Sequence, residues 1–507
     1  MEHGSRILTW ISDYLRRPEA LPVLSRSQPG EIRGNLPKRP PRHPQPMKRI
    51  LDDFERLIVP GNTHWNHPGF MAYFGITGSM PGILAEALSA ALNVNAMLWK
   101  TSPAATELEE TVLDWLRQLL GLPRRFWGVM QDTASVSSLV ALVAARQAIP
   151  GVRDEGLAGR TDVPPLTFYT SQEAHSSIEK AGIVLGVGRQ GVRRIATDKI
   201  FRLDPQALDA AVRRDRREGR RPFAVVATAG TTSTTSVDPL QEIATVCRRH
   251  KLWLHVDAAY AGSAAILPEK RDLLRGWERA DSIVVNPHKW LFTPIDCSVL
   301  YCRKPDVIRE ALSIVPAYLQ TREADRVTNY MDYGVALGRR FRALKLWFVL
   351  RAYGSDGLRE RLQRHIELAR RFAAWIRRHP GFELAAPVPF STVCFRLAPS
   401  SASGASGGPT GGGTTRAKAA TSGRRGSRRD ASSENMDKLN AALLDRVNAR
   451  GEVFISSTRI HDRLTLRAAI GNIRTGEEEV RRLRGILEEE AQRLHSRRTG
   501  GARRRTR

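Results

Sequence analysis

Cysteine is scarce in this chain. Among 507 residues there are only four, and none of them forms a CxxC pair or lies beside a histidine-rich segment: Cys247, Cys297, Cys302 and Cys394. Their scarcity and spacing argue against a disulfide framework and a zinc site, and predict a reducing compartment. Long apolar runs are also missing, so the sequence predicts neither a signal peptide nor a membrane-spanning helix, and we expect a cytoplasmic protein.

Acidic residues are few relative to basic ones. The chain has 52 Asp and Glu against 79 Lys and Arg, a formal net charge of +27. Much of this excess lies in two tracts, 416–429 and 497–507, outside the predicted core. Neither tract has interleaved aromatic side chains, as a surface for single-stranded nucleic acid would. A nucleic-acid-binding protein is the competing interpretation of the charge, but we expect neither a nucleic-acid nor a membrane partner.

Short apolar runs alternate with helical patterns between residues 127 and 303. The strand-like runs are 127–130, 166–169, 223–228, 252–256, 283–285 and 298–301, and the helical stretches include 135–147, 176–185 and 240–250. This alternation is typical of an α/β fold with a mainly parallel sheet covered on both faces by helices. Ligands of such sheets bind beyond the carboxyl ends of the strands.

The segments around this region differ in composition. Residues 1–100 are expected to form an N-terminal arm and dimerisation segment that begins with an amphipathic helix, and 101–343 the large domain. Residues 344–495 predict a small C-terminal α/β domain. Within it, 399–435 is rich in Gly, Ser, Thr and Arg, which predicts a disordered insertion. The last residues, 496–507, predict a disordered basic tail.

Lys289 follows a predicted strand end, in the segment Asn286-Pro287-His288-Lys289-Trp290. A lysine amine in the ligand crevice can form a Schiff base with an aldehyde cofactor, as in the tethering of pyridoxal phosphate (PLP). Asp257 closes the run 252–256, where a carboxylate can pair with a pyridine nitrogen and keep the ring protonated, and Ala259 leaves room for a ring. Taken alone, a surface lysine would be the commoner explanation of Lys289, and an N-cap or turn aspartate would explain Asp257 about equally well.

Three further strand ends carry polar groups. After 127–130, a turn with Thr133 leads into a helix near Ser135, which offers backbone N–H groups and hydroxyls to an anion. His175 follows 166–169, where an imidazole can stack over a cofactor ring, and Thr228 closes 223–228. A helix cap or a structural histidine would explain any one of them. Together with Lys289 and Asp257, all five strand ends predict a single site.

At these residues the sequence resembles the group II PLP-dependent decarboxylases, the family of aromatic-L-amino-acid decarboxylase. The Asn-Pro-His-Lys-Trp motif is the most specific part of the resemblance, which extends over most of the chain through 62–68, 101–109 and 337–342. It implies PLP fold type I, the aspartate-aminotransferase-like architecture, with a seven-stranded-type sheet in the large domain. It also implies a homodimer with active sites at the interface.

The resemblance further implies roles for individual residues. Lys289 carries PLP, Asp257 pairs with the pyridine nitrogen, His175 stacks on the ring and Ala259 packs against its other face. Four residues hold the cofactor's phosphate: Ala134, Ser135, Asn286 and His288. Thr228 lies near the cofactor's oxygen or the substrate carboxylate.

Six residues separate Tyr330 from the 337–342 motif, and Tyr330 matches a tyrosine on a mobile loop that supplies a proton in this family. Tyr333 and Tyr318 are rivals for that role. In the family, replacement of this tyrosine or of the stacking histidine is associated with aldehyde formation. Both residues are present in this sequence, which favours plain decarboxylation to an amine and CO2.

An aromatic L-amino acid (tryptophan, tyrosine, phenylalanine or dihydroxyphenylalanine) is the expected substrate because three aromatic side chains predict the pocket: Trp65, Tyr73 and Phe74. Gly75 and Ile76 depart from the pattern of the animal enzymes, so the preference among aromatic substrates stays open. Two alternatives also stay open: decarboxylation of glutamate, histidine or diaminobutyrate, and oxidative decarboxylation-deamination to an aldehyde.

Overall fold

The computed structural model describes residues 2–314, 319, 321–323, 325–398 and 423–504. Its larger sheet has seven strands in the order β1-β7-β6-β5-β4-β2-β3. They are β1 (Trp127–Gln131), β2 (Leu166–Ser171), β3 (Val192–Ile195), β4 (Arg221–Thr228), β5 (Trp253–Asp257), β6 (Ser282–Val285) and β7 (Ser298–Cys302). Only β7 runs antiparallel to its neighbours. The predicted mainly parallel α/β sheet is therefore confirmed.

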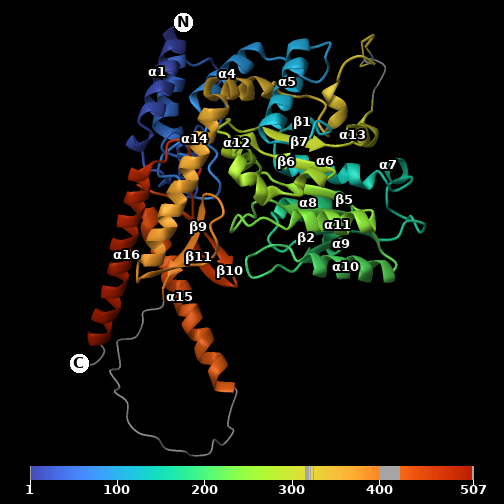
Figure 1. Ribbon diagram of the computed structural model, residues 1–507. Helices are drawn as coiled ribbons and strands as arrows, with labels where there is room; N and C mark the ends of the chain where they lie inside the picture. Colours follow the sequence, from blue (N-terminus) through green and yellow to red (C-terminus); the bar gives the residue numbers. More distant parts are fainter. Residues whose placement is uncertain (1, 315–318, 320, 324, 399–422, 505–507) are drawn as a thin grey trace, which may run out of the picture.

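Helices cover both faces of this sheet, which is why β2 and β7 are buried at every position. One face packs against α5 (Pro103–Leu119), α10 (Pro205–Arg217) and α11 (Leu240–His250). The other packs against α6 (Ala134–Arg146), α8 (Ser176–Val184) and α13 (Pro305–Leu312). Short helices α7 (Val152–Glu155), α9 (Gly188–Gly191) and α12 (Pro287–Trp290) lie in the connections. The layers are visible in Figure 1.

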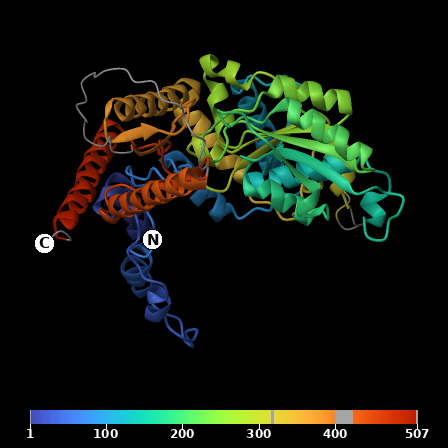
Figure 2. The ribbon, with the colours of Figure 1, turned by 90° about the horizontal axis from the view of Figure 1, so that it is seen from below.

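A second sheet of four antiparallel strands lies beside the first in the order β10-β11-β9-β8. Its strands are β8 (Phe382–Leu384), β9 (Thr392–Leu397), β10 (Ser456–Ile460) and β11 (Arg463–Ala469). Three long helices accompany it, α14 (Arg342–Arg378), α15 (Gly423–Ala449) and α16 (Glu477–Arg504), as Figure 2 shows. Helix α14 bends at Gly354, where φ is 62°, and its two halves contact α4 and α5 on one side and β8 and β9 on the other. It thereby connects the two layers.

The first hundred residues form an arm of helices. It comprises α1 (Glu2–Arg16), α2 (Glu31–Asn35), α3 (Met47–Asp53) and α4 (Met80–Leu92). The predicted amphipathic helix is confirmed as α1, which projects at the N-terminal end of the molecule in Figures 1 and 2. Its Leu15 is buried, whereas Ile7 and Leu8 are exposed.

Two segments that we predicted to be disordered are helical in part. Of the segment 399–435, residues 399–422 lie outside the described residues, but α15 already begins at Gly423 instead of near residue 436. Of the tail 496–507, α16 continues as far as Arg504. Both extensions are rich in arginine, a good helix former, and contain no proline. They therefore prolong helices whose nuclei are anchored by buried residues such as Leu443 and Leu487.

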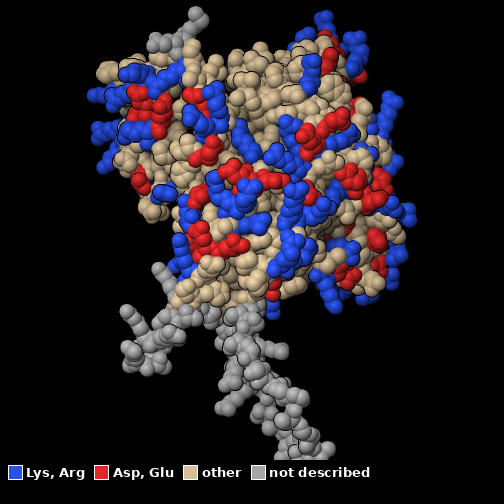
Figure 3. Space-filling model, turned by 60° about the vertical axis from the view of Figure 1, so that its left-hand side comes forward, with Lys and Arg blue, Asp and Glu red and all other residues tan. Residues whose placement is uncertain are grey.

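Charges of both signs intermingle on the face shown in Figure 3. Ion pairs also connect α16 to its neighbours, as between Arg371 of α14 and Glu477, and between Arg450, which follows α15, and Glu489. Across the described ranges, no helix has the length and apolar character needed to cross a membrane.

Candidate active site

A cavity of about 400 Å³ lies at the carboxyl ends of the parallel strands, where the two sheets meet. It is closed by the 65–76 segment on one side and by β10 and β11 on another. Twelve of the thirteen predicted site residues line it: Trp65, Tyr73, Phe74, Ala134, Ser135, His175, Thr228, Asp257, Ala259, Asn286, His288 and Lys289. The strand ends that were far apart in the sequence thus form one site.

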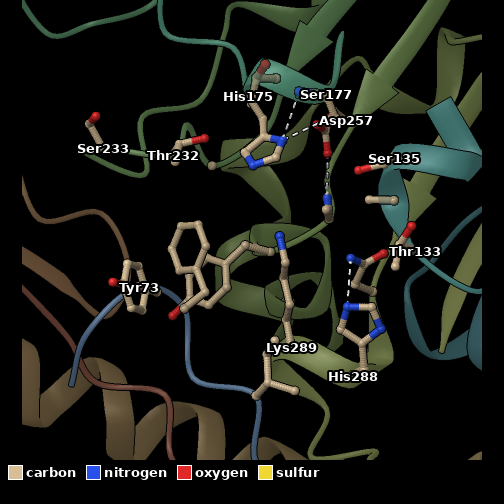
Figure 4. A pocket seen from close by; sticks show the side chains of 18 of the residues that line it. Tyr73, Thr133, Ser135, His175, Ser177, Thr232, Ser233, Asp257, His288 and Lys289 are labelled. Carbon is tan, nitrogen blue, oxygen red and sulfur yellow. Dashed lines mark hydrogen bonds between the residues drawn. The ribbon is translucent and has the colours of Figure 1, made fainter. Parts of the chain in front are cut away.

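Lys289 projects into the middle of the cavity (Figure 4). It belongs to the short helix α12, whose first residue is Pro287, and its Nζ lies 5.3 Å from the centre of the Phe74 ring. Burial lowers the pKa of the Lys289 amine, which the charge of Asp257 opposes and that of Arg467 reinforces. A lowered pKa makes the neutral amine, the form that attacks an aldehyde, more abundant.

Asp257 is the last residue of β5 and is buried at the cavity wall. Its Oδ1 accepts a hydrogen bond from the backbone N–H of Ala259 at 3.1 Å. In the described part of the chain, its Oδ2 accepts none. The carboxylate is thus held in a fixed orientation with one oxygen available to a ligand.

His175 is the N-cap residue of α8, and the cap fixes its ring. Its Nδ1 accepts a hydrogen bond from the backbone N–H of Ser177 at 3.2 Å and lies 2.8 Å from the Ser177 hydroxyl (Figure 4). Partial desolvation lowers the pKa of His175; Asp257 opposes this effect and Lys289 adds to it. The ring is therefore neutral near pH 7, with its proton on Nε2 because Nδ1 is an acceptor.

His288, the residue directly before Lys289 on α12, is held equally firmly. Its Nδ1 accepts from the backbone N–H of Cys297 at 2.9 Å, and its Nε2 lies 3.2 Å from the side-chain amide of Asn286. Burial lowers the pKa of His288 to about 3, with Lys289 as a second cause. His288 is thus a neutral hydrogen-bonding group rather than a cation.

Several polar groups of the cavity fit a polar ligand such as PLP. The hydroxyl of Thr228 and the Oδ1 of Asn286 are buried without a hydrogen-bond partner among the residues described. Helix α6 begins at Ala134, and its N-cap residue, Thr133, does not cap it with a side-chain hydrogen bond. An anion at this helix end would meet free backbone N–H groups and the Ser135 hydroxyl.

The opposite wall is aromatic. Trp65 and Tyr73 stack with their ring centres 6.0 Å apart, and Phe74 stacks on Tyr260 at 3.9 Å. Tyr73 has a φ of 51°, a value that a tyrosine adopts only where the surrounding structure holds it. This wall offers a flat apolar surface to a substrate side chain.

Known proteins resemble this chain over nearly its whole length. The pyridoxal-dependent decarboxylase conserved domain matches residues 29–398. The chain belongs to the pyridoxal-dependent decarboxylase family. Its cofactor is PLP.

Two relatives illustrate the range of the family. A phenylacetaldehyde synthase of Arabidopsis thaliana and tryptophan decarboxylase 2 of Oryza sativa subsp. japonica are each 39% identical to it, over 97% of this chain and 95% and 94% of theirs. The crystal structure of Oryza sativa TDC with PLP and tryptamine superposes with a TM-score of 0.88 at 35% identity, covering 97% of both chains.

Arg467 is a site residue of this decarboxylase that the sequence did not lead us to predict. It comes from β11, is buried, and its guanidinium lies 4.5 Å from the centre of the Phe74 ring. It donates to the backbone carbonyls of Ser233, at 3.0 Å, and Tyr73, which leaves Nη2 buried with no partner in the described ranges. The signal was an arginine within the run 464–469, but its contacts with Tyr73, Phe74 and Ser233 join segments far apart in the sequence.

Tyr330 is the one predicted residue that the structure does not bring to the cavity. It is buried in a short 3-10 turn, its ring stacks on Trp127 at 5.7 Å, and the guanidinium of Arg339 lies 4.6 Å from its centre. Arg339 is fixed in turn by Glu109 at 2.7 Å. In the decarboxylase chain described here, these contacts hold Tyr330 beside β1 rather than on a loop at Lys289, so its role as proton donor stays a prediction.

Of the two rivals, Tyr333 does not line the cavity either. Tyr333 packs against Trp127 with ring centres 4.4 Å apart, and its backbone carbonyl accepts a hydrogen bond from Gln131. Tyr318 lies outside the described residues.

Proposed function

We propose that this decarboxylase converts an aromatic L-amino acid into the corresponding amine and CO2. The observation that carries the proposal is the aromatic wall of Trp65, Tyr73 and Phe74, which faces Lys289 across a cavity of about 400 Å³. A cavity of this size accommodates an indole or phenol side chain beside a cofactor. The named activities of tryptophan and tyrosine decarboxylases among its relatives support the same substrate class.

The residues of the cavity have separate roles toward the cofactor. PLP, when bound, supplies an aldehyde for the substrate amine and a ring that accepts the electron pair of the broken bond. Lys289 would hold the cofactor through its amine. The free Oδ2 of Asp257 would keep a proton on the ring nitrogen, and His175 would contact the ring. The phosphate would be held by four residues that line the cavity: Ala134, Ser135, Asn286 and His288.

Arg467 and Thr228 orient the substrate in this proposal. The unpartnered Nη2 of Arg467 and the unpartnered hydroxyl of Thr228 are the polar groups left to receive a carboxylate. As the bond from the α-carbon to the carboxylate breaks, CO2 leaves without the bonding electrons and a proton takes its place. The aromatic wall excludes water while this proton is delivered.

Aldehyde formation is the second candidate reaction. It is favoured by one observation, the position of Tyr330 away from the cavity of its own chain, and a phenylacetaldehyde synthase is among the relatives. The two reactions differ in their products, because aldehyde formation consumes O2 and releases ammonia and hydrogen peroxide with CO2.

The test is a product assay of the PLP-loaded protein with all common L-amino acids. We expect amine and CO2 in equal amounts from an aromatic substrate, without peroxide. Peroxide and ammonia in step with CO2 would replace the amine-forming reaction with the aldehyde-forming one. Turnover of only glutamate, histidine or diaminobutyrate would overturn the aromatic assignment.

Tyr330→Phe separates the role of that tyrosine from its packing. The variant keeps the ring that stacks on Trp127 and removes only the hydroxyl. If Tyr330 is the proton donor, amine formation falls and peroxide rises, while Tyr333→Phe leaves both unchanged. Unchanged products in Tyr330→Phe would mean that another group delivers the proton.

We also propose that two copies of this chain form a dimer. Four exposed apolar residues follow each other at every fourth position on α4, with exposed fractions of 39, 43, 50 and 60%: Met80, Leu84, Leu88 and Leu92. Residues spaced by four form one helix stripe, and an apolar stripe of this length marks an interface. Tyr73 and Ile295, at the cavity, are also more than half exposed, so a second copy would cover the mouth of the site.

The double variant Leu84→Glu/Leu88→Glu tests this dimer by light scattering after size exclusion. We expect the mass of a dimer for the unaltered protein and of a monomer for the variant. Ile183→Glu on α8, where the isoleucine is 52% exposed, is the matched control and should stay dimeric. A monomeric unaltered protein would overturn the proposal.

We further propose that the protein works in the cytoplasm. All four cysteines are free and buried, which supports a reducing compartment. Fractionation of the source cells with an antibody to the chain tests this assignment.

A further inference from the structure

A second cavity, of about 300 Å³, lies at the opposite edge of the seven-stranded sheet. Strands β5 and β6 begin there and the antiparallel β7 ends there. Leu254 lines this second cavity, whereas Asp257, three residues later on β5, lines the active site. At roughly 3.3 Å per residue, the two cavities are about 10 Å apart along that strand. The two ends of β6 show the same separation: Asp281, just before the strand, lines the second cavity, and Asn286, just after it, lines the active site.

The wall of this second cavity is strongly basic. Five cationic side chains line it: Arg125, Arg248, Lys251, Arg279 and Arg303. Asp281 is the one carboxylate in the wall, and it pairs with Arg303 at 2.5 Å. Within the described ranges the other four cations form no ion pair, which leaves four uncompensated positive charges around one small space.

Structural roles account for only part of these cations. Arg125 donates to the carbonyl of Glu278 at 2.8 Å, and Arg279 to that of Gln241 at 3.2 Å, so both guanidinium groups are held at the wall with N–H groups to spare. Arg248 lies in the last turn of α11, where a cation stabilises the helix end.

Two features of the cavity point to a ligand. The Nε of Arg303 is buried without a hydrogen-bond partner among the residues described, although its guanidinium is fixed by Asp281. In addition, like charges gathered in one hollow repel each other, which disfavours the folded state unless an anion binds between them.

We propose that this cavity binds a small anion with two or more phosphate groups, either free or as part of a nucleoside diphosphate. Arginine guanidinium groups hold phosphate oxygens through paired N–H donors, and four of the five cations are arginines. Four uncompensated charges match a multivalent anion better than a single phosphate. The site is separate from the place where the active site holds the cofactor's phosphate.

The experiment titrates inorganic pyrophosphate into the full-length, PLP-loaded protein in a calorimeter. Loading fills the phosphate place of the active site, so the titration reports on other sites, and cofactor absorbance confirms that PLP stays bound. We expect saturable binding of one pyrophosphate per chain that weakens as NaCl is raised. ADP in a parallel titration distinguishes the two sources: tighter binding than pyrophosphate identifies a nucleotide, and equal or weaker binding identifies the free diphosphate.

Charge reversal locates the binding. Arg248→Glu/Lys251→Glu should weaken pyrophosphate binding at least tenfold, with circular dichroism and cofactor content unchanged. The matched control is Arg214→Glu/Arg217→Glu, which changes the charge equally at two exposed arginines of the neighbouring helix α10 and should weaken binding less than twofold. Absence of saturable binding to the unaltered protein, or equal weakening in both double variants, would overturn the proposal.

Discussion

At the carboxyl edge of the seven-stranded sheet, side chains of both charge signs and several neutral donors surround one lysine, whereas at the amino edge five cations share a cavity with one carboxylate. At the first edge, burial and fixed partners lower the pKa values of Lys289, His175 and His288. At the second, Arg248 and Lys251 are exposed. Groups tuned by burial and orientation can carry out a reaction, while exposed charges of one sign can only bind.

Among the variants at the carboxyl edge, Lys289→Ala should cause the largest loss of activity. Because Lys289 is the only lysine among the described residues of the cavity wall, amine formation should fall at least about 10⁴-fold, the range seen when a covalent catalyst loses its nucleophile. The lysine-bound cofactor absorbance should vanish as well. Lys180→Ala, at an exposed position of α8, serves as control and should keep both. Measurable turnover in Lys289→Ala would show that the cofactor is held elsewhere.

Asp257→Asn tests whether charge or shape matters at the end of β5. The amide oxygen can still accept the hydrogen bond from Ala259, so the fold is preserved, but the negative charge is gone. We expect kcat to fall roughly 10²- to 10³-fold, the scale of losing one preorganised electrostatic partner. A kcat within a factor of three of the original would exclude the pairing of Asp257 with the cofactor ring.

Arg467→Lys tests whether the four-stranded sheet contributes to substrate binding at the carboxyl edge. The positive charge is kept but the paired donors are lost, so KM for the substrate should rise about tenfold while kcat changes less. Arg463→Lys, at the exposed start of β11, is the control. If KM is unchanged in Arg467→Lys, the substrate carboxylate binds elsewhere.

Histidines buried in the core predict how stability depends on pH. Burial lowers the pKa values of His255, on β5 between the two edges, and His365 to about 4, from 6.5. Protonation therefore favours the unfolded chain, so the stability that each histidine contributes is complete above pH 6.5 and is lost as the pH falls toward 4. At pH 5 this loss amounts to about 2 kcal/mol for each histidine.

Urea unfolding at pH 7 and pH 5 measures this loss. His255→Gln should reduce the difference between the free energies of unfolding at pH 7 and pH 5 by the amount that His255 contributes. His43→Gln, at an exposed position, should leave this difference unchanged. An unchanged difference in His255→Gln would show that other groups control acid unfolding.

The sequence indicated the main sheet and most of the candidate site for one reason. Buried parallel strands give short apolar runs separated by helices, and the carboxyl ends of such strands meet at one edge. The same reasoning missed β3, because its two arginines, Arg193 and Arg194, hide a short strand at the edge of the sheet. It also set the beginning of α15 too late, since local composition does not show how far an anchored helix extends.

Sequence alone determined where most of the sheet-forming segments lie along the chain and which chemical groups follow them, since strand periodicity and side-chain type are local properties. Tertiary structure alone decided the rest. The position of β11 brings Arg467 into the cavity of Lys289, and the contacts of Trp127 and Arg339 hold Tyr330 away from that cavity. The starts of β5 and β6 gather the cations of the second cavity. Each of these arrangements joins residues far apart in the chain, and only packing fixes such distances.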